Sequence, residues 1–234
     1  MKKLLFDDKP VNFPATQIKG AALKPITEVL LDRRATSHFK ADPVPDEYLD
    51  AILRFGAQAP SGYNFQPWRF VVVRDEANRK RLQKAAYEQP KVAEAPVMLV
   101  AFSVEQEWRD SMDQVFDEGV RRGYGNAEGS ARTKKNAVQF LETMPLDVWM
   151  NRHTMIALTT MMLVAEAYGL DTAPMEGFDP EAVKRTLGLP DRAVVVALLG
   201  IGFAQEPDKV YGGRLALSEF VHSERYGEKW AAKS

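Results

Sequence analysis

Three short apolar runs constrain the fold of this 234-residue chain most strongly. They lie at 68–73, 97–102 and 194–201 and are rich in valine, leucine and other apolar residues. Runs of this length and composition are typical of β-strands. The second and third are apolar almost throughout, which predicts strands that are covered on both faces. We therefore expect a buried central sheet with helices packed against it.

Segments with helical periodicity separate these runs. We expect helices from Pro25 to about 33, from 46 to before Pro60, over 76–89, from about 105, over 146–168, and from Pro180 to Gly188. A glycine-rich, charged loop is expected at 119–129, and its composition is that of a mobile segment. This order predicts an α+β or α/β layer architecture in one domain spanning 1–234, with an extended arm at 1–23. The order of the strands is not predicted.

Composition excludes several classes of function. The 31 lysines and arginines balance 32 acidic residues, so no excess charge favours nucleic acid or an anionic membrane as a partner. Cysteine is absent, which excludes disulfides, thiolate metal sites and a cysteine nucleophile. The three histidines have no paired ligand spacing, and we predict no metal. No export signal is visible, so a cytoplasmic location is expected.

A basic segment follows the first expected helix. Arg33 and Arg34 precede Ala35, Thr36 and Ser37. Two guanidinium groups beside hydroxyls suit a phosphate dianion. The alternative is a solvated helix end, in which the arginines complement the negative end of the helix dipole. Taken alone, the segment does not decide between the two.

A second unusual segment lies immediately before the first expected strand. Residues 59–68 carry Ser61, Asn64 and Gln66 among small and aromatic residues. Pro60 and Gly62 would account for an ordinary turn. The two side-chain amides are more than a turn requires, and amides pair with the polar edge of a heterocycle. Loops carried by rigid elements are where binding sites commonly lie.

These segments together resemble the nitroreductase family. The likeness rests on the basic motif at 33–39, the loop at 59–68 and the following strand, and it resumes at 95–97, 173–179 and 213–215. It implies an α+β fold with a central mixed, mainly antiparallel sheet covered by helices. It also implies an intertwined homodimer with FMN in each of two clefts between subunits, in which residues 218–234 embrace the partner.

The resemblance assigns the FMN-binding residues. By this resemblance, the FMN phosphate and ribityl chain are bound by Arg33, Arg34, Ala35 and Ser37. Arg214, far along the chain, binds the same phosphate. The flavin ring falls to Ser61, Asn64, Gln89, Glu176 and Gly177, with backbone N–H groups of the last two facing flavin N5. Tyr63 and Trp149 are candidates for the substrate pocket. Many family members carry a cation where Ser37 stands, which leaves His38 or another arginine to compensate at the flavin N1/O2 edge.

The implied activity is a flavin-dependent reduction with no catalytic side chain, because the chemistry takes place at flavin N5. FMN accepts a hydride from NADH or NADPH and passes it to an electron-poor small molecule, a nitroaromatic or a quinone, in a ping-pong sequence. Two alternatives stay open. One is a flavin-binding or sensor protein without turnover, and the other is a relative with a different reduction, such as dehalogenation or enoate reduction. Hydrolase, P-loop and Rossmann fingerprints are absent.

Overall fold

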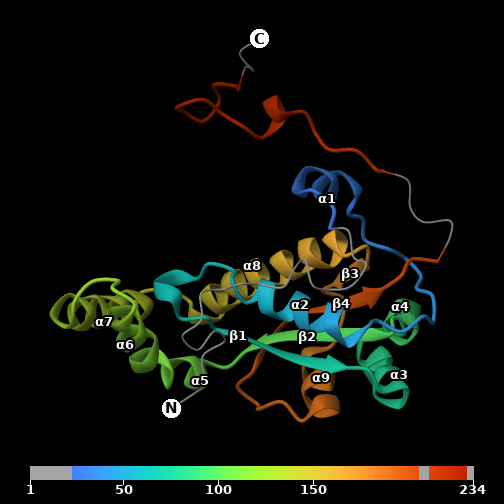
Figure 1. The fold of residues 1–234 in the computed structure, drawn as a ribbon, viewed down its shortest axis with the longest axis horizontal. Coiled ribbons are helices and arrows are strands. Elements are labelled where there is room, and N and C mark those ends of the chain that lie inside the picture. Colours follow the sequence, from blue (N-terminus) through green and yellow to red (C-terminus); the bar gives the residue numbers. More distant parts are fainter. Residues whose placement is uncertain (1–22, 206–210, 231–234) are drawn as a thin grey trace.

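The computed structural model describes residues 23–205 and 211–230 (Figure 1). The arm expected at 1–23 therefore lies outside the described residues except for its last position, and so do residues 231–234 of the C-terminal segment.

A four-stranded sheet forms the centre of the described molecule. Its strands are β1 (Trp68–Val73), β2 (Val97–Ser103), β3 (Asp171–Met175) and β4 (Val194–Gly202), in the order β1-β2-β4-β3. Each neighbouring pair is antiparallel. An isolated parallel bridge joins Ala35 to Thr172 on β3. The predicted α+β fold with a mainly antiparallel central sheet is confirmed.

Helical layers cover both faces of this sheet (Figure 1). One layer contains α2 (Asp46–Gly56) and α8 (Leu146–Ala167), and the other contains α3 (Glu76–Ala85), α4 (Pro90–Glu94) and α9 (Pro180–Leu187). Along β2, Val97 and Leu99 pack into the first layer, whereas Met98 and Val100 pack into the second. Alternate side chains thus enter two separate cores, which is why this strand is apolar throughout.

Helix ends follow from capping chemistry that the sequence displays. Asp179 accepts hydrogen bonds from the first N–H groups of α9, and Gly188 ends that helix in the left-handed conformation. The predicted helices α8 and α9 are confirmed within a residue. The helix expected over 76–89 instead ends at Ala85, because Tyr87 and Glu88 both adopt left-handed backbone conformations with φ of 53° and 56°.

Strand β3 and helices α4 and α7 (Ala127–Leu141) were not predicted. Strand β3 contains Pro174, which argues against a strand, but β3 lies at the edge of the described sheet, where proline is tolerated. Helix α7 begins inside the loop expected at 119–129. The connection between α6 (Met112–Arg121) and α7 is in fact confined to 122–126, and the Asn126 side chain caps α7 at the N–H of Gly129.

The remaining elements lie at the margins of the sheet. Helix α1 (Ile26–Asp32) rests on the end of α8, and α5 (Glu105–Arg109) leads into the α6–α7 hairpin, so the helix expected from about 105 is interrupted. Two short 3-10 turns occur at Gly62–Asn64 and Leu217–Glu219. Residues 211–230 extend away from the helical layers beyond α1 (Figure 1). Among the described helices, none is long and apolar enough to cross a bilayer.

Candidate functional site

The basic segment after α1 is fixed against the edge strand β3. The N–H of Arg33 donates to the carbonyl of Val29 and closes the last turn of α1. Two residues later, Ala35 bridges Thr172, and the Thr36 N–H donates to the Thr172 carbonyl at 3.1 Å. Arg33 and Arg34 therefore lie between a helix end and a strand, both of which restrict the backbone.

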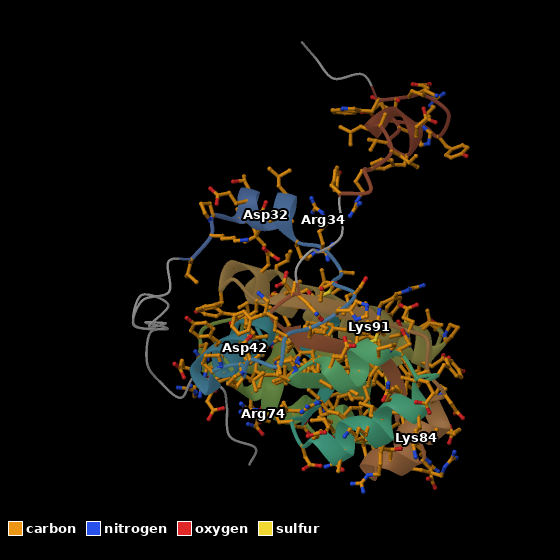
Figure 2. All side chains as sticks on the ribbon, turned by 90° about the vertical axis from the view of Figure 1, so that its right-hand side faces the viewer. Asp32, Arg34, Asp42, Arg74, Lys84 and Lys91 are labelled. Carbon is orange, nitrogen blue, oxygen red and sulfur yellow. The ribbon has the colours of Figure 1, made fainter. Side chains whose placement is uncertain are left out.

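Tyr211 brings the two basic segments together. The Arg34 guanidinium carbon lies 4.4 Å from the centre of the Tyr211 ring, and that of Arg214 lies 5.6 Å from it. Figure 2 shows Arg34 at the end of α1, facing away from the sheet. Cations placed over an aromatic face are attracted by its quadrupole. Two positive charges held at one ring form a site suited to a dianion.

Gln89 and the Glu176-Gly177 turn are joined directly. The Gln89 side-chain amide donates to the Gly177 carbonyl at 2.7 Å and to the Ala86 carbonyl at 3.1 Å. The turn is tied to α3 as well, because the Asp179 N–H donates to the Ala85 carbonyl. Both Glu176 and Gly177 are exposed. The amide N–H₂ group predicted for the flavin pyrimidine is thus engaged in holding the turn.

His38 and Ser37 differ in their surroundings. His38 Nδ1 lies 3.1 Å from the Glu94 carboxylate on α4. This pairing directs the imidazole toward α4, so the structure gives no support to His38 as the group that replaces the missing cation. Ser37 is half-buried next to the bridge that Ala35 makes with β3.

The loop before β1 is strained and internally braced. Tyr63, Asn64 and Gln66 have φ of 54°, 57° and 48°, a region that costs non-glycine residues energy. Ser61 Oγ accepts from the Gln66 N–H at 3.0 Å, and the Gln66 amide donates to the carbonyl and side chain of Asn64. Strain retained by such bonds is common at binding sites. Ser61 and Gln66 hold the loop, which presents Tyr63 and Asn64.

The loop and the basic segment lie at opposite ends of the sheet. The loop leads into Trp68, which pairs with Ser103 at the end of β2. The basic segment instead bridges Thr172, whose partner Ile201 pairs with Val97 at the start of β2. Six residue steps separate the two ends, about 20 Å along a strand. One chain therefore does not bring all of the predicted residues to one place.

Aromatic side chains surround the loop. Tyr63 is 38% exposed and contacts Phe65 and Phe140 with ring centres 5.6 and 6.5 Å apart. Trp149 is only 4% exposed, and its ring centre lies 4.4 Å from that of His153 with the two rings tilted. Of the two candidates for the substrate pocket, Tyr63 is thus at the surface of the chain and Trp149 is within the core.

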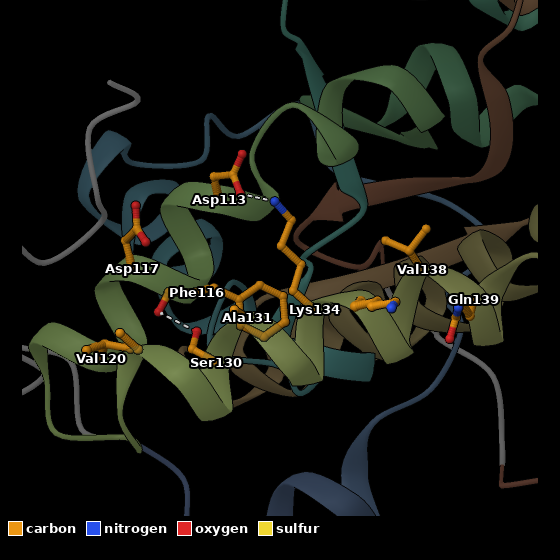
Figure 3. Close-up of a pocket in the computed structure, with 11 residues that line it drawn as sticks. Asp113, Phe116, Asp117, Val120, Ser130, Ala131, Lys134, Val138 and Gln139 are labelled. Atoms are coloured by element: carbon orange, nitrogen blue, oxygen red, sulfur yellow. Dashed lines mark hydrogen bonds and ion pairs between the residues drawn. The ribbon is translucent and has the colours of Figure 1, made fainter.

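The α6–α7 hairpin contains a cavity of about 630 Å³ (Figure 3). Phe116, Val120 and Val138 give it an apolar floor, and an ion pair between Asp113 and Lys134 lies at its rim. None of the predicted FMN residues lines it. In the described part of the chain, no group of three or more histidine, aspartate or glutamate side chains is placed to hold a metal ion.

Two residues that contact the basic segments, Tyr211 and Thr172, were not predicted from the sequence. Tyr211 had a signal, since an aromatic residue lies three positions before Arg214. No sequence signal marks Thr172. It contacts Ala35, which lies more than a hundred residues away in the sequence, and that contact depends on strand order. The donor set as a whole fits a phosphorylated, planar cofactor: arginines for the phosphate, and exposed backbone and amide groups for the ring. That combination defines a class of cofactor-binding α+β protein.

Comparison with known proteins specifies the class. Residues 30–203 match the model of the nitroreductase family. An NADH dehydrogenase of Thermus thermophilus is 38% identical over 193 residues, 82% of this chain and 89% of that protein. A Bacillus subtilis protein named as an NAD(P)H nitroreductase is 31% identical, over 83% of this chain and 97% of its own. The chain belongs to the nitroreductase family.

A solved structure adds a cofactor to the comparison. A protein of Exiguobacterium sibiricum, described as a nitroreductase in complex with FMN, has a TM-score of 0.78 and 26% identity. The likeness covers 86% of this chain and 98% of that one.

Proposed function

We propose that this chain is an FMN-dependent NAD(P)H oxidoreductase that reduces a nitroaromatic or quinone in a ping-pong sequence, working as a homodimer. The observation that carries the proposal is the convergence of Arg34 and Arg214 on Tyr211 in a chain of this family. An isolated helix end would not require a second arginine from a segment so distant in sequence.

The two basic segments and the Glu176-Gly177 turn would supply binding and orientation. Arg33, Arg34 and Arg214 would hold the FMN phosphate by charge-assisted hydrogen bonds, with Ser37 and the backbone of Ala35 beside the ribityl chain. Gln89 would act on the ring by fixing the Glu176-Gly177 turn, through its bond to the Gly177 carbonyl. A turn held from α3 and α4 presents its backbone N–H groups with little freedom to reorient.

A second copy of the chain would complete each site. The strained loop with Tyr63 and Asn64 lies at the far end of its own sheet, so we assign it to the FMN held by the partner. Apolar side chains on α1 support association, since Ile26, Leu30 and Leu31 are 60%, 61% and 70% exposed in the single chain. Leu217, Phe220 and Trp230 of the C-terminal segment are exposed as well and would pack on the partner.

Bound between these groups, FMN would supply the redox chemistry, taking a hydride from NADH or NADPH and passing it to the acceptor. The protein contributes position and electrostatics. Tyr63 offers an exposed aromatic face, against which a planar nicotinamide or acceptor ring would stack in turn. The loop and the α6–α7 hairpin would limit access of water. No side chain is required as acid, base or nucleophile.

The proposal is tested by the visible spectrum of the purified protein. We expect bound flavin, bleaching on anaerobic addition of NADH or NADPH, and recovery of colour when a nitroaromatic or quinone is then added. Steady-state rates should give the parallel double-reciprocal lines of a ping-pong sequence. Bleaching without recovery by any acceptor would favour a flavin-binding protein without turnover. A protein that stays colourless after reconstitution with FMN would refute the proposal.

A further inference from the structure

Glu166, in the last turn of α8, carries a buried carboxylate in an unfavourable place. Its side chain is 8% exposed. The C-terminal end of a helix is the negative end of the helix dipole, which repels a carboxylate, and burial removes the water that would otherwise solvate it. An ionised carboxylate in such a position is costly unless a nearby cation pairs with it.

Lys24 provides that cation from outside the helix. Its Nζ lies 2.6 Å from Glu166 Oε1 and 3.2 Å from Asp32 Oδ2. The hydrogen bond to Glu166 is the main reason why the pKa of Lys24 is raised, so the lysine stays charged well above neutral pH. The Lys24 backbone N–H also donates to the Ala167 carbonyl at 3.1 Å. This bond satisfies one of the carbonyl groups at the end of α8 that have no partner within the helix. Side chain and backbone of one residue thus bind the same helix end.

Helix α1 has few other attachments to the residues that the structure describes. It has seven residues, too few to be stable alone, and Val29 is its one buried residue. Lys24 holds the chain at the start of α1, while Ala35 and Thr36 hold it on β3 after the helix. Arg33 and Arg34 lie between these two anchors. Asp32, bonded to Lys24, is their immediate neighbour (Figure 2).

We propose that Lys24 and Glu166 are positioning residues that lock α1 onto α8, and thereby set the arginines of the phosphate site. The inference rests on the proposed function, because it concerns the same FMN site. Neither residue touches the cofactor. Glu166 is buried and Lys24 is partly exposed. An ion pair with a buried partner contributes little net stability compared with apolar residues of similar size, so its value here lies in fixing one geometry.

FMN affinity of the Lys24→Met apoprotein, titrated by quenching of flavin fluorescence, tests the role. We expect the Kd to rise by roughly 2- to 30-fold, as for a residue that acts through others. Lys24→Arg should restore affinity, because arginine also donates to the carboxylate. The matched control is Lys80→Met, which breaks an exposed i,i+4 pair with Glu76 on α3 and should leave the Kd unchanged.

Two further variants keep the test decisive. If Lys24→Met alone does not fold, Lys24→Met with Glu166→Met replaces the pair by apolar side chains and should fold, yet still bind FMN weakly. In an Arg34→Ala background, Lys24→Met should raise the Kd for FMN by a smaller factor than it does in the wild-type chain. The reason is that Lys24 cannot position an arginine that is absent. Wild-type affinity in the folded Lys24→Met or double variant, or full additivity with Arg34→Ala, would overturn the inference. Failure of the wild-type chain to bind FMN would instead refute the proposed function.

Discussion

A chain carrying both Arg34→Ala and Arg214→Ala should bind FMN roughly 10²- to 10⁴-fold more weakly than the wild-type chain. A hydrogen bond to a charged group contributes about 1.5–3 kcal/mol, and two arginines facing one phosphate give about twice that. Each ~1.4 kcal/mol corresponds to tenfold in Kd. Both guanidinium carbons lie within 5.6 Å of the centre of the Tyr211 ring, so we expect both to contact the same phosphate.

The measurement is a fluorescence titration of each single variant and of the double variant. Each single substitution should show an intermediate loss. Arg185→Ala serves as the control, because Arg185 is exposed on α9 and belongs to neither basic segment. Affinity in the double variant that matches the control would mean that the phosphate does not lie at the Tyr211 ring.

Gly202→Ala should lower the free energy of unfolding by about 1–3 kcal/mol, the cost of overpacking a tight core. A Cβ on Gly202 would lie 2.6 Å from Pro96 Cδ and 3.0 Å from Phe39 Cδ1. The proline ring has no rotamer that clears the contact, and Phe39 is itself buried. The added methyl therefore has to displace backbone at the end of β4.

The free energy of unfolding is measured by denaturant titration of Gly202→Ala and of a control variant, Gly119→Ala. Gly119 lies within α6, and a Cβ there meets Tyr124 at an ordinary 4.0 Å. Alanine at that position should raise the free energy of unfolding by about 0.5–1 kcal/mol, because glycine is unfavourable inside a helix. Equal stability of the two variants would show that β4 is not packed against Pro96 as described.

The layered fold was predictable where pattern and chemistry agree. The apolar run of β2 indicated burial on both faces, and Asp179 with Gly188 marked both ends of α9. Prediction failed where local chemistry contradicts the tertiary outcome. Pro174 argued against the strand β3, and the glycines at 123, 125 and 129 indicated a loop where α7 begins. In each case packing against neighbours overrides a weak local preference.

The sequence suggested residues for the candidate site but not their arrangement. Arg33 and Arg34 stood out by type, yet their relation to Arg214 depends on Tyr211 and on how the C-terminal segment returns to α1. The Gln89 amide was predicted as a flavin ligand, and its bond to Gly177 links positions 88 residues apart. The separation of the loop from the basic segment follows from strand order and pairing register, which no pattern within a strand reveals.

The central claim is that each FMN site combines the basic segment of one chain with the loop of another. It is tested by co-expressing two differently tagged chains, one with Arg34→Ala and Arg214→Ala and the other with Ser61→Ala and Asn64→Ala. The purified mixed dimer then contains one site with both halves intact and one with both altered. We predict that it regains FMN binding and NAD(P)H oxidation that neither altered homodimer has. A mixed dimer no more active than the two homodimers would contradict a shared site.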